Sequence, residues 1–489
     1  MPWNMPSRIA CAVVLASTLV ACSGCAPTTR QSTARGDFTP TISEDVTAPA
    51  LYQYEASKET TIKDESRDLS IYASNGYLKR RDGDSDYLVG LDGNNMLSEP
   101  IRNVESIRGD TAIVMTEDPG PHNAGIVNLD KGVLVKPEAA LIKPARSYDG
   151  EPRFAQVAYA TGEAKDVESG FVYVSDSGLT TYYDGDGYAA YEGYARVFDL
   201  EAGDFVDGLK LEQSDPKLYD FGDTFLVCQG GRAELYDPSG KRLWAEEGSA
   251  SAGAHSFFFF GDDKDTKRII GADGKTRFTA DDFLIAISGP DDLYSYHDDT
   301  VIDMNGNVVL ECPNIWIWGE AEGMYEMNEM GNNYKRQIID GTGKRVCEGS
   351  ELERVLPGYA RINTQTQGSG NRYSLYSGGE LVASNLDWSG ASRLAIKDGD
   401  QRYASLAKYY VFADHACTLG LTGCTALDIG LVYGRTENGA PLGVYDLFTG
   451  EEIIPAQYDK IGRLGSYVFA RADDTWDVYR VQRLDASQT

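Results

Sequence analysis

Carboxylates are the most abundant side chains in this sequence that could act as acids, bases or ligands. The 489 residues include 75 Asp and Glu against 45 Lys and Arg, which gives a formal net charge of −30. A pair of carboxylates can hydrolyse a glycosidic bond, but residue type alone selects no pair among so many. The negative charge repels a phosphate backbone, so we predict no nucleic-acid partner.

Two groups of alternating aspartates have the side chains that bind Ca²⁺. The first group is Asp82, Asp84 and Asp86, and the second is Asp184 and Asp186. A Ca²⁺-binding EF-hand loop also needs Gly at its sixth position and Glu at its twelfth, and neither group has them. We interpret both groups as solvated turns and predict no metal and no cofactor, with weak Ca²⁺ binding as the alternative.

The sequence also lacks the local patterns of common catalytic sites. The four histidines have no metal-ligand spacing, and they are His122, His255, His297 and His415. A Gly-x-Ser-x-Gly elbow, a Walker loop and a dinucleotide fingerprint are absent as well. We therefore predict no catalytic residues.

Cys22 is the residue with the clearest chemical role. A single charge, Arg8, precedes an apolar run from Ile9 to Val20, which has the length of a secretory segment and is too short to span a bilayer. The run ends in Leu19-Val20-Ala21-Cys22, which resembles the lipobox of bacterial lipoproteins. The resemblance implies that Cys22 receives a diacylglyceryl group and becomes the mature N-terminus. An ordinary secretory signal cleaved elsewhere, or a lipid on Cys25, are the alternatives.

The lipobox also implies a location. Several acyl chains would hold the protein durably on the extracytoplasmic face of a bacterial cell membrane. We therefore expect a lipoprotein signal peptide at residues 1–21. The stretch from residue 23 to about residue 51 is rich in Ser, Thr, Pro and Ala without apolar periodicity, so we expect a flexible tether over residues 22–65.

Four further cysteines are candidates for disulfide bonds, because an exported chain can be oxidised. Cys312 and Cys347 lie 35 residues apart, about one period of the repeat described below. Cys417 and Cys424 would close a short local loop. Cys228 then remains, and we expect it to be a buried thiol.

Two groups of aromatic residues could form a binding surface. They are Tyr182, Tyr183, Tyr188, Tyr191 and Tyr194, and separately Trp316 and Trp318. Such rings pack against sugar faces or partner side chains while their polar atoms form hydrogen bonds. The alternative is that they form aromatic cross-strand pairs within sheets.

A repeated element must position these side chains. The recurring pattern is two or three apolar residues, often an Asp, a turn with Gly, and a second apolar pair, as in Leu235–Gly240 and Ile338–Gly343. The turn glycines between Gly203 and Gly379 are 32 to 37 residues apart. The 357 residues from Gly93 to Gly450 fit ten steps of that length, and therefore eleven units.

Apolar spacing within the units is that of β-strands. Tyr479 and Val481 alternate with polar residues, which is the period of a half-buried strand. Phe257 to Phe260 is apolar on both faces, as expected of an inner strand covered by its neighbours. Helical periodicity is nearly absent, and Glu351 to Leu356 is one weak helical candidate.

The last repeats have a more specific pattern. Leu442-Gly443-Val444-Tyr445-Asp446 is followed by Ile453-Ile454-Pro455 and Tyr458-Asp459, and Trp476-Asp477 opens the next unit. A fainter copy begins at Ala124-Gly125-Ile126-Val127-Asn128. This pattern resembles the WG-repeat family of bacterial proteins, although Trp-Asp replaces Trp-Gly at residue 476. The resemblance implies no catalytic residues.

Short strands at this period predict an all-β fold. Four strands per unit suit the blades of a β-propeller, in one ring or two because eleven blades are many for a single ring. A β-solenoid is the alternative. We expect the repeat body at residues 66–484 and a tail at 485–489, and we expect a strand near Ser70 to Lys79 to complete the last sheet.

These observations predict a lipid-anchored, non-catalytic scaffold that binds a protein or glycan partner. The alternatives are a propeller-type glycoside hydrolase with carboxylates in its central channel, and a structural spacer in the cell envelope.

Overall fold

The computed structural model divides the chain into two compact units, Met1–Phe38 and Thr39–Thr489. The first unit, with the predicted lipidation site Cys22, lies outside the described residues. The structure describes residues 41–42, 52–71, 77–117, 122–147, 151–166, 179–183, 188–211, 217–261, 267–282, 284–287, 291–296, 300–311, 315–329, 336–356, 358–364, 373–386, 394–396, 402–406, 409–410, 421–428, 430–437, 439–446, 449 and 451–485.

Every regular element in the described ranges is a β-strand. The all-β prediction is therefore confirmed, and the described residues contain no helix that could cross a membrane. The weak helical prediction for Glu351 to Leu356 is wrong, because these residues lie in strand β30 (Ser350–Leu356) and pair with the next strand.

The described antiparallel strands form ten sheets, one of which runs through seven strands from β15 to β21. We divide that sheet at its long strand β18 and number the resulting groups sheets 1 to 11 in chain order. Sheet 1 contains β3 (Leu69–Ile71), β4 (Leu78–Asp82) and β5 (Ser85–Leu88), and sheet 2 contains β6 (Ile101–Arg108), β7 (Thr111–Thr116), β8 (Ala124–Asn128) and β9 (Gly132–Ala139). Sheet 3 contains β10 (Leu141–Pro144), β11 (Phe154–Asp166), β12 (Leu179–Tyr183), β13 (Tyr188–Asp199) and β14 (Asp204–Leu211). Sheet 4 contains β15 (Lys217–Asp220), β16 (Phe225–Gln229), β17 (Arg232–Tyr236) and β18 (Arg242–Ala252).

Sheets 5 to 8 follow the same plan. Sheet 5 shares β18 and adds β19 (Ser256–Gly261), β20 (Lys267–Gly271) and β21 (Thr276–Thr279), and sheet 6 contains β22 (Leu284–Ala286), β23 (Tyr294–Tyr296), β24 (Thr300–Ile302) and β25 (Val308–Glu311). Sheet 7 contains β26 (Ile315–Ala321), β27 (Met324–Glu329), β28 (Arg336–Asp340) and β29 (Arg345–Glu348). Sheet 8 contains β30, β31 (Tyr359–Asn363), β32 (Tyr373–Ser377) and β33 (Glu380–Leu386), with β1 (Thr41–Ile42) beside β33.

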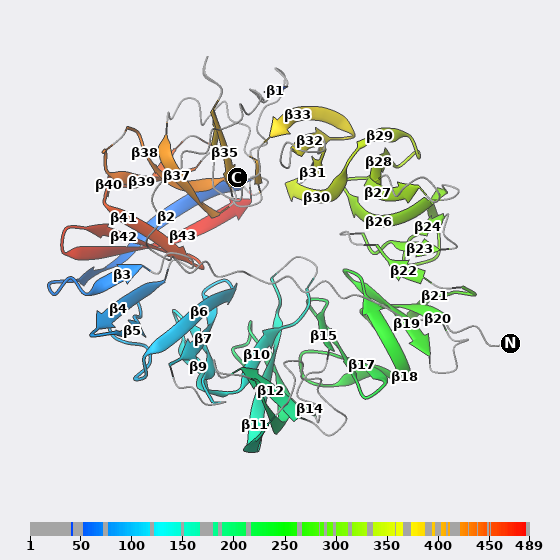
Figure 1. The fold of residues 1–489 in the computed structure, drawn as a ribbon, viewed down its shortest axis with the longest axis horizontal. Coiled ribbons are helices and arrows are strands. Elements are labelled where there is room, and N and C mark those ends of the chain that lie inside the picture. The colour runs from blue at the N-terminus through cyan, green and yellow to red at the C-terminus, as the bar shows by residue number, and fades with distance from the viewer. Residues whose placement is uncertain are drawn as a thin grey trace, which may run out of the picture. The chain divides into compact units, whose positions relative to one another are not determined.

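Sheets 9 to 11 complete the set. Sheet 9 contains β34 (Leu394–Ile396), β35 (Arg402–Leu406) and β36 (Tyr409–Tyr410). Sheet 10 contains β37 (Thr422–Asp428), β38 (Leu431–Arg435), β39 (Leu442–Asp446) and β40 (Glu452–Tyr458). Sheet 11 contains β41 (Lys460–Leu464), β42 (Tyr467–Ala472) and β43 (Thr475–Asp485), together with β2 (Tyr52–Lys63). Figure 1 shows these sheets following one another in chain order.

Most sheets are meanders of four strands, which we call A, B, C and D. Sheet 2, for example, has the order β6-β7-β8-β9. Because the strands are antiparallel, the A–B and C–D turns lie at one end of a sheet and the B–C turn at the other. In sheet 3 the additional strand β12 pairs with β13.

Hydrophobic cores lie between consecutive sheets. One core joins Phe221 and Leu235 of sheet 4 to Phe257 and Phe259 of sheet 5. Phe258, on the other face of β19, packs against sheet 6. The prediction that this strand is apolar on both faces is confirmed. Equivalent cores join sheets 2 and 3, 3 and 4, 6 and 7, 7 and 8, and 10 and 11. Successive four-stranded antiparallel sheets that pack face to face are the architecture of a β-propeller.

The C–D turns of sheets 1, 4, 5, 6 and 7 are nearly identical. In sheet 4 the amide of Asp237 donates to the carbonyl of Lys241, and the amide of Gly240 donates back to the carbonyl of Asp237. The same pair of hydrogen bonds recurs in the turns of Gly93, Gly274, Gly306 and Gly343. The φ angles of these five glycines lie between +76° and +82°, a region that favours glycine. The repeated Gly of the sequence is therefore a turn requirement.

The C–D glycines also face the D strand of the preceding sheet. A Cβ on Gly240 would lie 2.5 Å from the carbonyl oxygen of Asp207 in β14, and one on Gly274 would lie 3.3 Å from Cβ of Trp244 in β18. A Cβ on Gly306 would overlap the ring of Phe278 in β21. The absence of a side chain at this position lets consecutive sheets approach each other closely.

Strand β2 provides the D strand of the last sheet. It pairs with β43 from Tyr52 opposite Asp485 to Lys63 opposite Thr475, and Figure 1 shows the blue β2 beside the red β43. A Cβ on Gly93 of sheet 1 would lie 2.8 Å from Ile62 of β2, which is the contact that the other C–D glycines make. The N-terminal and C-terminal ends of the repeat body are thus joined in one sheet.

The closure was predicted with the wrong strand. Residues of the expected closing segment, Ser70 to Lys79, lie in β3 and β4 of sheet 1 where the structure describes them. The predicted tether at 22–65 contains the whole of β2, and Asp485 of the predicted tail ends β43. The reason is that Tyr54 and Ile62 of β2 are buried among polar neighbours, so the segment has little apolar character of its own.

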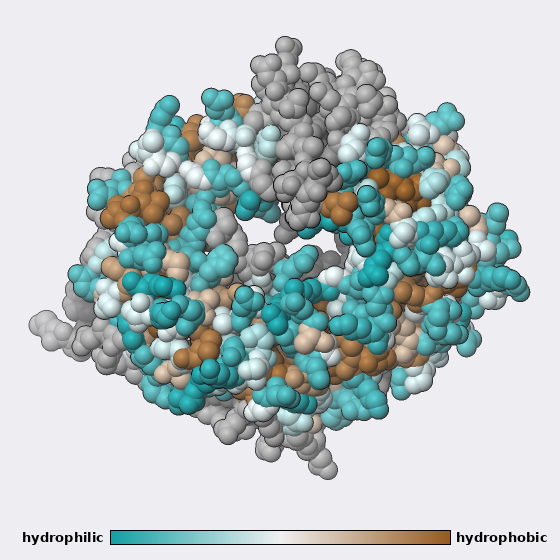
Figure 2. All heavy atoms as spheres, turned by 180° about the vertical axis from the view of Figure 1, so that it is seen from behind, coloured by the Kyte–Doolittle hydropathy of each residue, from teal (hydrophilic) through white to brown (hydrophobic). Residues whose placement is uncertain are grey.

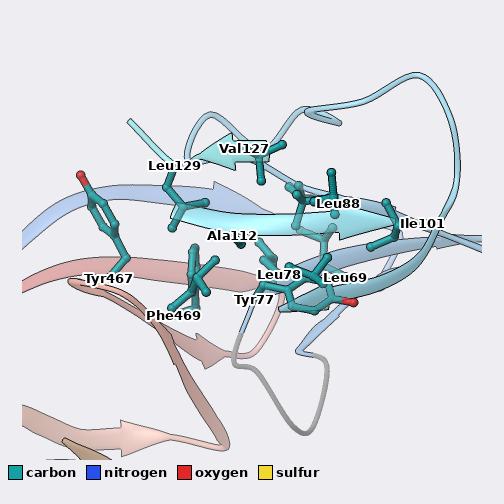
Figure 3. Packing of buried hydrophobic residues seen from close by; sticks show 14 of the residues in the cluster. Leu69, Tyr77, Leu78, Leu88, Ile101, Ala112, Val127, Leu129, Tyr467 and Phe469 are labelled. Atoms are coloured by element: carbon teal, nitrogen blue, oxygen red, sulfur yellow. The ribbon is translucent and has the colours of Figure 1, made fainter. Parts of the chain in front are cut away.

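A single core seals the junction of sheets 11, 1 and 2. Figure 3 shows Tyr467 and Phe469 of sheet 11 packed with Leu78 and Leu88 of sheet 1 and Val127 of sheet 2. At its edge, Asp110 accepts hydrogen bonds from the amide and the hydroxyl of Ser466, at 2.5 and 2.9 Å. Residues more than 350 positions apart are held together at this junction.

Candidate binding site

The predicted aromatic surface is divided between two sheets. Tyr182 and Tyr183 lie in β12, and Tyr188, Tyr191 and Tyr194 lie in β13, where Tyr183 is opposite Tyr188. Trp316 and Trp318 lie in β26 of sheet 7. The structure therefore brings the tyrosines to one pair of strands but does not place the two groups in a common strand pair.

Tyr194 is the one residue of these groups whose side chain the structure describes. Its ring stacks on Tyr159 of the neighbouring strand, with centroids 5.4 Å apart and an interplanar angle of 27°. Burial raises the pKa of Tyr159. Tyr194 thus forms the aromatic cross-strand pair that was the alternative prediction. The side chains of Tyr182, Tyr183, Tyr188, Tyr191, Trp316 and Trp318 lie outside the description.

Cysteine chemistry is limited in the described residues. Cys228 and Cys347 are free thiols, and burial raises the pKa of both, that of Cys228 to about 11. Cys347 packs with sheet 8 and shares a hydrogen bond with Tyr376, so the structure does not contain the predicted bridge to Cys312. Cys312, Cys417 and the side chain of Cys424 lie outside the described residues, and the bridge between Cys417 and Cys424 stays a prediction.

Metal sites were expected to be absent. Within the described ranges no group of three or more His, Cys, Asp or Glu is arranged to hold a metal ion. Asp86 forms an ion pair of 2.5 Å with Lys79, and Asp84 lies 3.8 Å from Arg81. The second aspartate group, Asp184 and Asp186, and the histidines His297 and His415 lie outside the described residues.

The structure does contain a pocket that no sequence pattern predicted. Its volume is about 390 Å³, and we call it the A–B pocket because its lining residues lie at or beside the A–B turns of five sheets. They are Arg108 of sheet 2; Ser147, Glu151 and Arg153 of sheet 3; Asp220, Phe221 and Gly222 of sheet 4; Ala254 and His255 of sheet 5; and Arg354 of sheet 8.

The propeller topology explains how distant residues meet there. Arg108 lies in β6, Asp220 in β15 and Arg354 in β30, each at or near the end of the A strand that leads into the A–B turn. Sheets 2 to 5 are consecutive, so their A–B turns are neighbours. Sheets 6 and 7 separate Arg354 from sheet 5 along the chain, and its presence in the lining shows that the A strands face a shared centre.

Arg153 and Asp220 form the rigid wall of the A–B pocket. The guanidinium of Arg153 holds the carboxylate of Asp199 through Nε and Nη2, at 3.1 and 2.9 Å. The carboxylate of Asp220 accepts the backbone amides of Arg153, Phe154 and Gly222. Burial raises the pKa of Asp220 in spite of these hydrogen bonds. Both charged groups therefore bind neighbouring protein atoms more than they face the cavity.

His255 is oriented by a buried polar network. Its Nδ1 lies 3.2 Å from Oδ2 of Asp292, and its backbone amide donates to the same carboxylate. Oδ1 of Asp292 accepts the hydroxyl of Ser256, which also contacts the hydroxyl of Tyr294 at 2.7 Å. The imidazole is itself 71% exposed. The network fixes one side of the ring and leaves Nε2 without a partner among the described residues.

A second pocket lies at the opposite end of the sheets. Its volume is about 520 Å³, and it is lined by residues at or beside the B–C turns of sheets 10 and 11, which include Arg435 and Arg471, by the end of β40, and by Arg67, which follows β2. Arg471 binds Asp459 and Arg67 binds Asp474. Figure 2 shows that the face seen from behind is mainly hydrophilic, with hydrophobic residues in small separate groups.

No sequence pattern predicts the A–B pocket, because the residues that line it follow no common spacing. Arg108, Arg153 and Arg354 are ordinary isolated cations when the chain is inspected in order. The one usable signal was positional, since Arg108 ends β6, Arg153 immediately precedes β11 and Arg354 lies near the end of β30.

Comparisons with known proteins assign this chain to no family. No protein-family profile matches the chain, and no curated protein sequence matches it. Among solved structures, a eukaryotic initiation factor is similar over 77% of this chain and 94% of its own, with 11% identity and a TM-score of 0.38. Porphyromonas gingivalis dipeptidyl peptidase 4 is similar over 72% of this chain and 58% of its own, with 9% identity and a TM-score of 0.32. Saccharomyces cerevisiae Sqt1 is similar over 78% and 95%, with 10% identity and a TM-score of 0.26.

Proposed function

We propose that this chain is a lipid-anchored, extracytoplasmic β-propeller protein that binds a glycan without catalysis. The observation that carries the proposal is the A–B pocket, to which five sheets contribute. A cavity of about 390 Å³ has the size of a small-ligand site, whereas a protein interface is a broad contact. Guanidinium, carboxylate, hydroxyl and imidazole groups line it beside Phe221, and such groups hold sugar hydroxyls and sugar faces.

A glycan array probed with the full chain tests the proposal. We expect a related set of glycans to bind. The exposed residue Glu151 allows the pocket to be obstructed, so Glu151→Trp should abolish binding. The matched control is Arg67→Trp, which places the same bulk in the second pocket at a side chain that is 72% exposed. An equal loss of glycan binding in both variants would contradict glycan binding at the A–B pocket. So would an array on which no glycan binds, if the chain instead captures a protein partner.

A glycoside hydrolase is the second candidate function, because two carboxylates line the same pocket. They are Glu151 and Asp220, and the raised pKa of Asp220 is the direction that a general acid needs. Against this function, both oxygens of Asp220 accept backbone amides. Incubation of a bound glycan should leave it intact. Release of reducing ends that disappears in Asp220→Asn would establish the hydrolase instead.

The WG-repeat resemblance belongs to this proposal and has a physical basis in the fold. Gly125 of β8 and Gly443 of β39 occupy the same place, in a C strand opposite an irregularity of the D strand. A Cβ on Gly125 would lie 2.7 Å from the carbonyl oxygen of Val135, and one on Gly443 would lie 3.1 Å from Cα of Ala456. The glycine of the motif thus allows the D strand to lie against the C strand.

The lipid anchor is also part of the proposal and rests on the lipobox. Labelling of the expressing bacterium with radioactive palmitate should mark the wild-type protein. Cys22→Ala should remove the label, and Cys25→Ala should keep it. If Cys25→Ala loses the label and Cys22→Ala keeps it, the lipid is on Cys25. If the wild-type protein is not labelled either, the chain is an ordinary secreted protein.

A further inference from the structure

Arginines outnumber carboxylates among the residues that line the A–B pocket. The whole sequence has 45 Lys and Arg against 75 Asp and Glu, whereas the pocket lining has three arginines against two carboxylates. One of those carboxylates, Asp220, directs both oxygens at backbone amides. The arginines pair with Glu201, Asp199 and Glu322, so what the cavity offers a ligand is a set of guanidinium N–H donors rather than a net positive charge.

Two of the arginines are oriented from behind and retain donors for a ligand. Nε of Arg354 lies 2.6 Å from Glu322, and Nη2 of Arg108 lies 3.6 Å from Glu201. A guanidinium has five N–H donors in a planar fork, so a single carboxylate on one side leaves others available. Their side chains are 44% and 32% exposed, so both groups can reach solvent in the pocket. Arg153 differs, because Asp199 takes its inner edge.

His255 supplies a further polar atom at the same cavity. Asp292 engages its Nδ1, which leaves Nε2 as the atom that can meet a ligand. The hydroxyl of Ser256 and the amide of His255 hold Asp292 in turn. The imidazole is therefore presented to the pocket in a defined orientation, which reduces the entropy lost when a ligand binds.

We propose that the ligand of the A–B pocket is a saccharide with a carboxylate group, of the uronic acid class, which Arg108 and Arg354 bind with assistance from His255. This inference rests on the proposed function. The planar fork of an arginine matches a carboxylate with two parallel hydrogen bonds. The sugar ring then lies toward Phe221, whose ring is fixed by its stacking on Phe257 at 6.0 Å.

Binding of matched oligosaccharides to the full chain tests this assignment. The probes are oligogalacturonate, its methyl ester and a sugar phosphate of the same size, measured by calorimetry at low and high salt. We expect the methyl ester to bind at least tenfold more weakly than the free acid, because charged hydrogen bonds are lost. Arg354→Gln and Arg108→Gln should each weaken binding of the acid about tenfold. Arg67→Gln, in the second pocket, should have no effect.

The outcomes separate the two proposals. Equal binding of the acid and its ester would overturn the carboxylate assignment but leave glycan binding in place. Selection of neutral glycans on the array would have the same meaning. Stronger binding of the sugar phosphate would also overturn it. If no glycan binds in either assay, the proposed function itself fails. Unaltered binding of the acid by both Arg→Gln variants would show that the carboxylate lies elsewhere.

Discussion

The C–D turns and the A–B turns lie at the same end of the sheets but are built in opposite ways. The C–D turns of sheets 1, 4, 5, 6 and 7 share one pair of hydrogen bonds and a glycine with φ near +80°. The A–B turns vary in length: sheets 2, 7, 8, 10 and 11 have two-residue turns such as Gly109–Asp110, whereas sheet 3 has residues 145–153 and sheet 5 has residues 253–255. One end of the sheets thus has a recurrent C–D turn beside A–B turns of several lengths.

This difference separates the residues that maintain the fold from those that are free to specialise. A C–D glycine must fit a turn and a neighbouring sheet at once, so its alternatives are few. The A–B turns that line the pocket include Gly222, whose Cβ would have no neighbour within 4 Å, whereas Gly465 in the A–B turn of sheet 11 lies against Gly109 and Asp110 of sheet 2. The candidate ligand pocket is built from A–B turns in five sheets, which is where variation is compatible with a stable fold.

Glycine substitutions should give the largest effect in this comparison. Gly240→Ala in a C–D turn adds a Cβ 2.5 Å from a backbone oxygen at φ +80°. We expect a loss of about 3 kcal/mol from the free energy of unfolding, because left-handed strain and overlap add. Gly222→Ala in an A–B turn has the same φ but no atom within 4 Å of its Cβ, and we expect about 1 kcal/mol.

Urea denaturation of the two variants measures the difference. Gly132→Ala provides a control within the C–D class, because its φ is +82° and its Cβ would have no neighbour within 4 Å. It should resemble Gly222→Ala. Equal losses in Gly240→Ala and Gly222→Ala would show that contact with the preceding sheet contributes nothing.

Part of this contrast could be predicted from the sequence. The Asp and Gly of the C–D turns act through hydrogen bonds within five residues, so each turn is visible locally and its repetition reveals the fold. Strand β2 was missed because its partner β43 is more than 400 residues away and its own pattern is weak. Pairing at that distance depends on the closed set of sheets, which no local pattern encodes.

Acid should weaken the C–D turns together. Hydrogen bonds from the side chain two residues further on lower the pKa of three C–D aspartates, which are Asp92, Asp237 and Asp340. A carboxyl with a lowered pKa in the folded state stabilises the fold above its unfolded pKa of about 3.9. That contribution is lost as the pH falls further, through the lower folded pKa. We therefore expect the urea midpoint to decline below about pH 4.

The variant Asp237→Asn should reduce the slope of that acid loss, because one titrating group is gone. The A–B carboxyl Asp220 behaves in the opposite way, since burial raises its pKa and its contribution falls as the pH rises through the folded pKa. A midpoint that is constant from pH 5 to pH 3 would contradict the role given to the turn carboxylates.

Removal of a single C–D aspartate should have a smaller effect. Asp237→Ala deletes hydrogen bonds of 2.9 Å from Ser239 and 3.1 Å from Lys241, and we expect a loss of about 1 kcal/mol. The matched A–B variant is Asp223→Ala, whose carboxylate is fully exposed and 3.7 Å from Arg153. Its loss should stay below about 0.5 kcal/mol. Thermal unfolding of both variants provides the measurement, and a larger loss for Asp223→Ala would reverse the comparison.

The candidate site was less predictable than the turns, for a physical reason. Arg108 and Arg354 are 246 positions apart, and only the packing of the A strands brings them to one pocket. The aromatic prediction relied on residues close in sequence, and Tyr194, whose ring is described, packs within its own sheet. Proximity along the chain identified strands, whereas the pocket depends on proximity across sheets.

The smallest expected effect on stability is that of Arg354→Gln, and it is also the most informative. The ion pair of Arg354 with Glu322 involves side chains that are 44% and 20% exposed, and such pairs contribute about 0–1 kcal/mol. We expect the free energy of unfolding to change by less than about 0.5 kcal/mol, while binding of the acidic saccharide falls. Chemical denaturation and calorimetry on the same preparation report both quantities. A loss of stability as large as that of Gly240→Ala would mean that the A–B edge maintains the fold as well, because a residue kept for ligand contact has no reason to stabilise the empty protein.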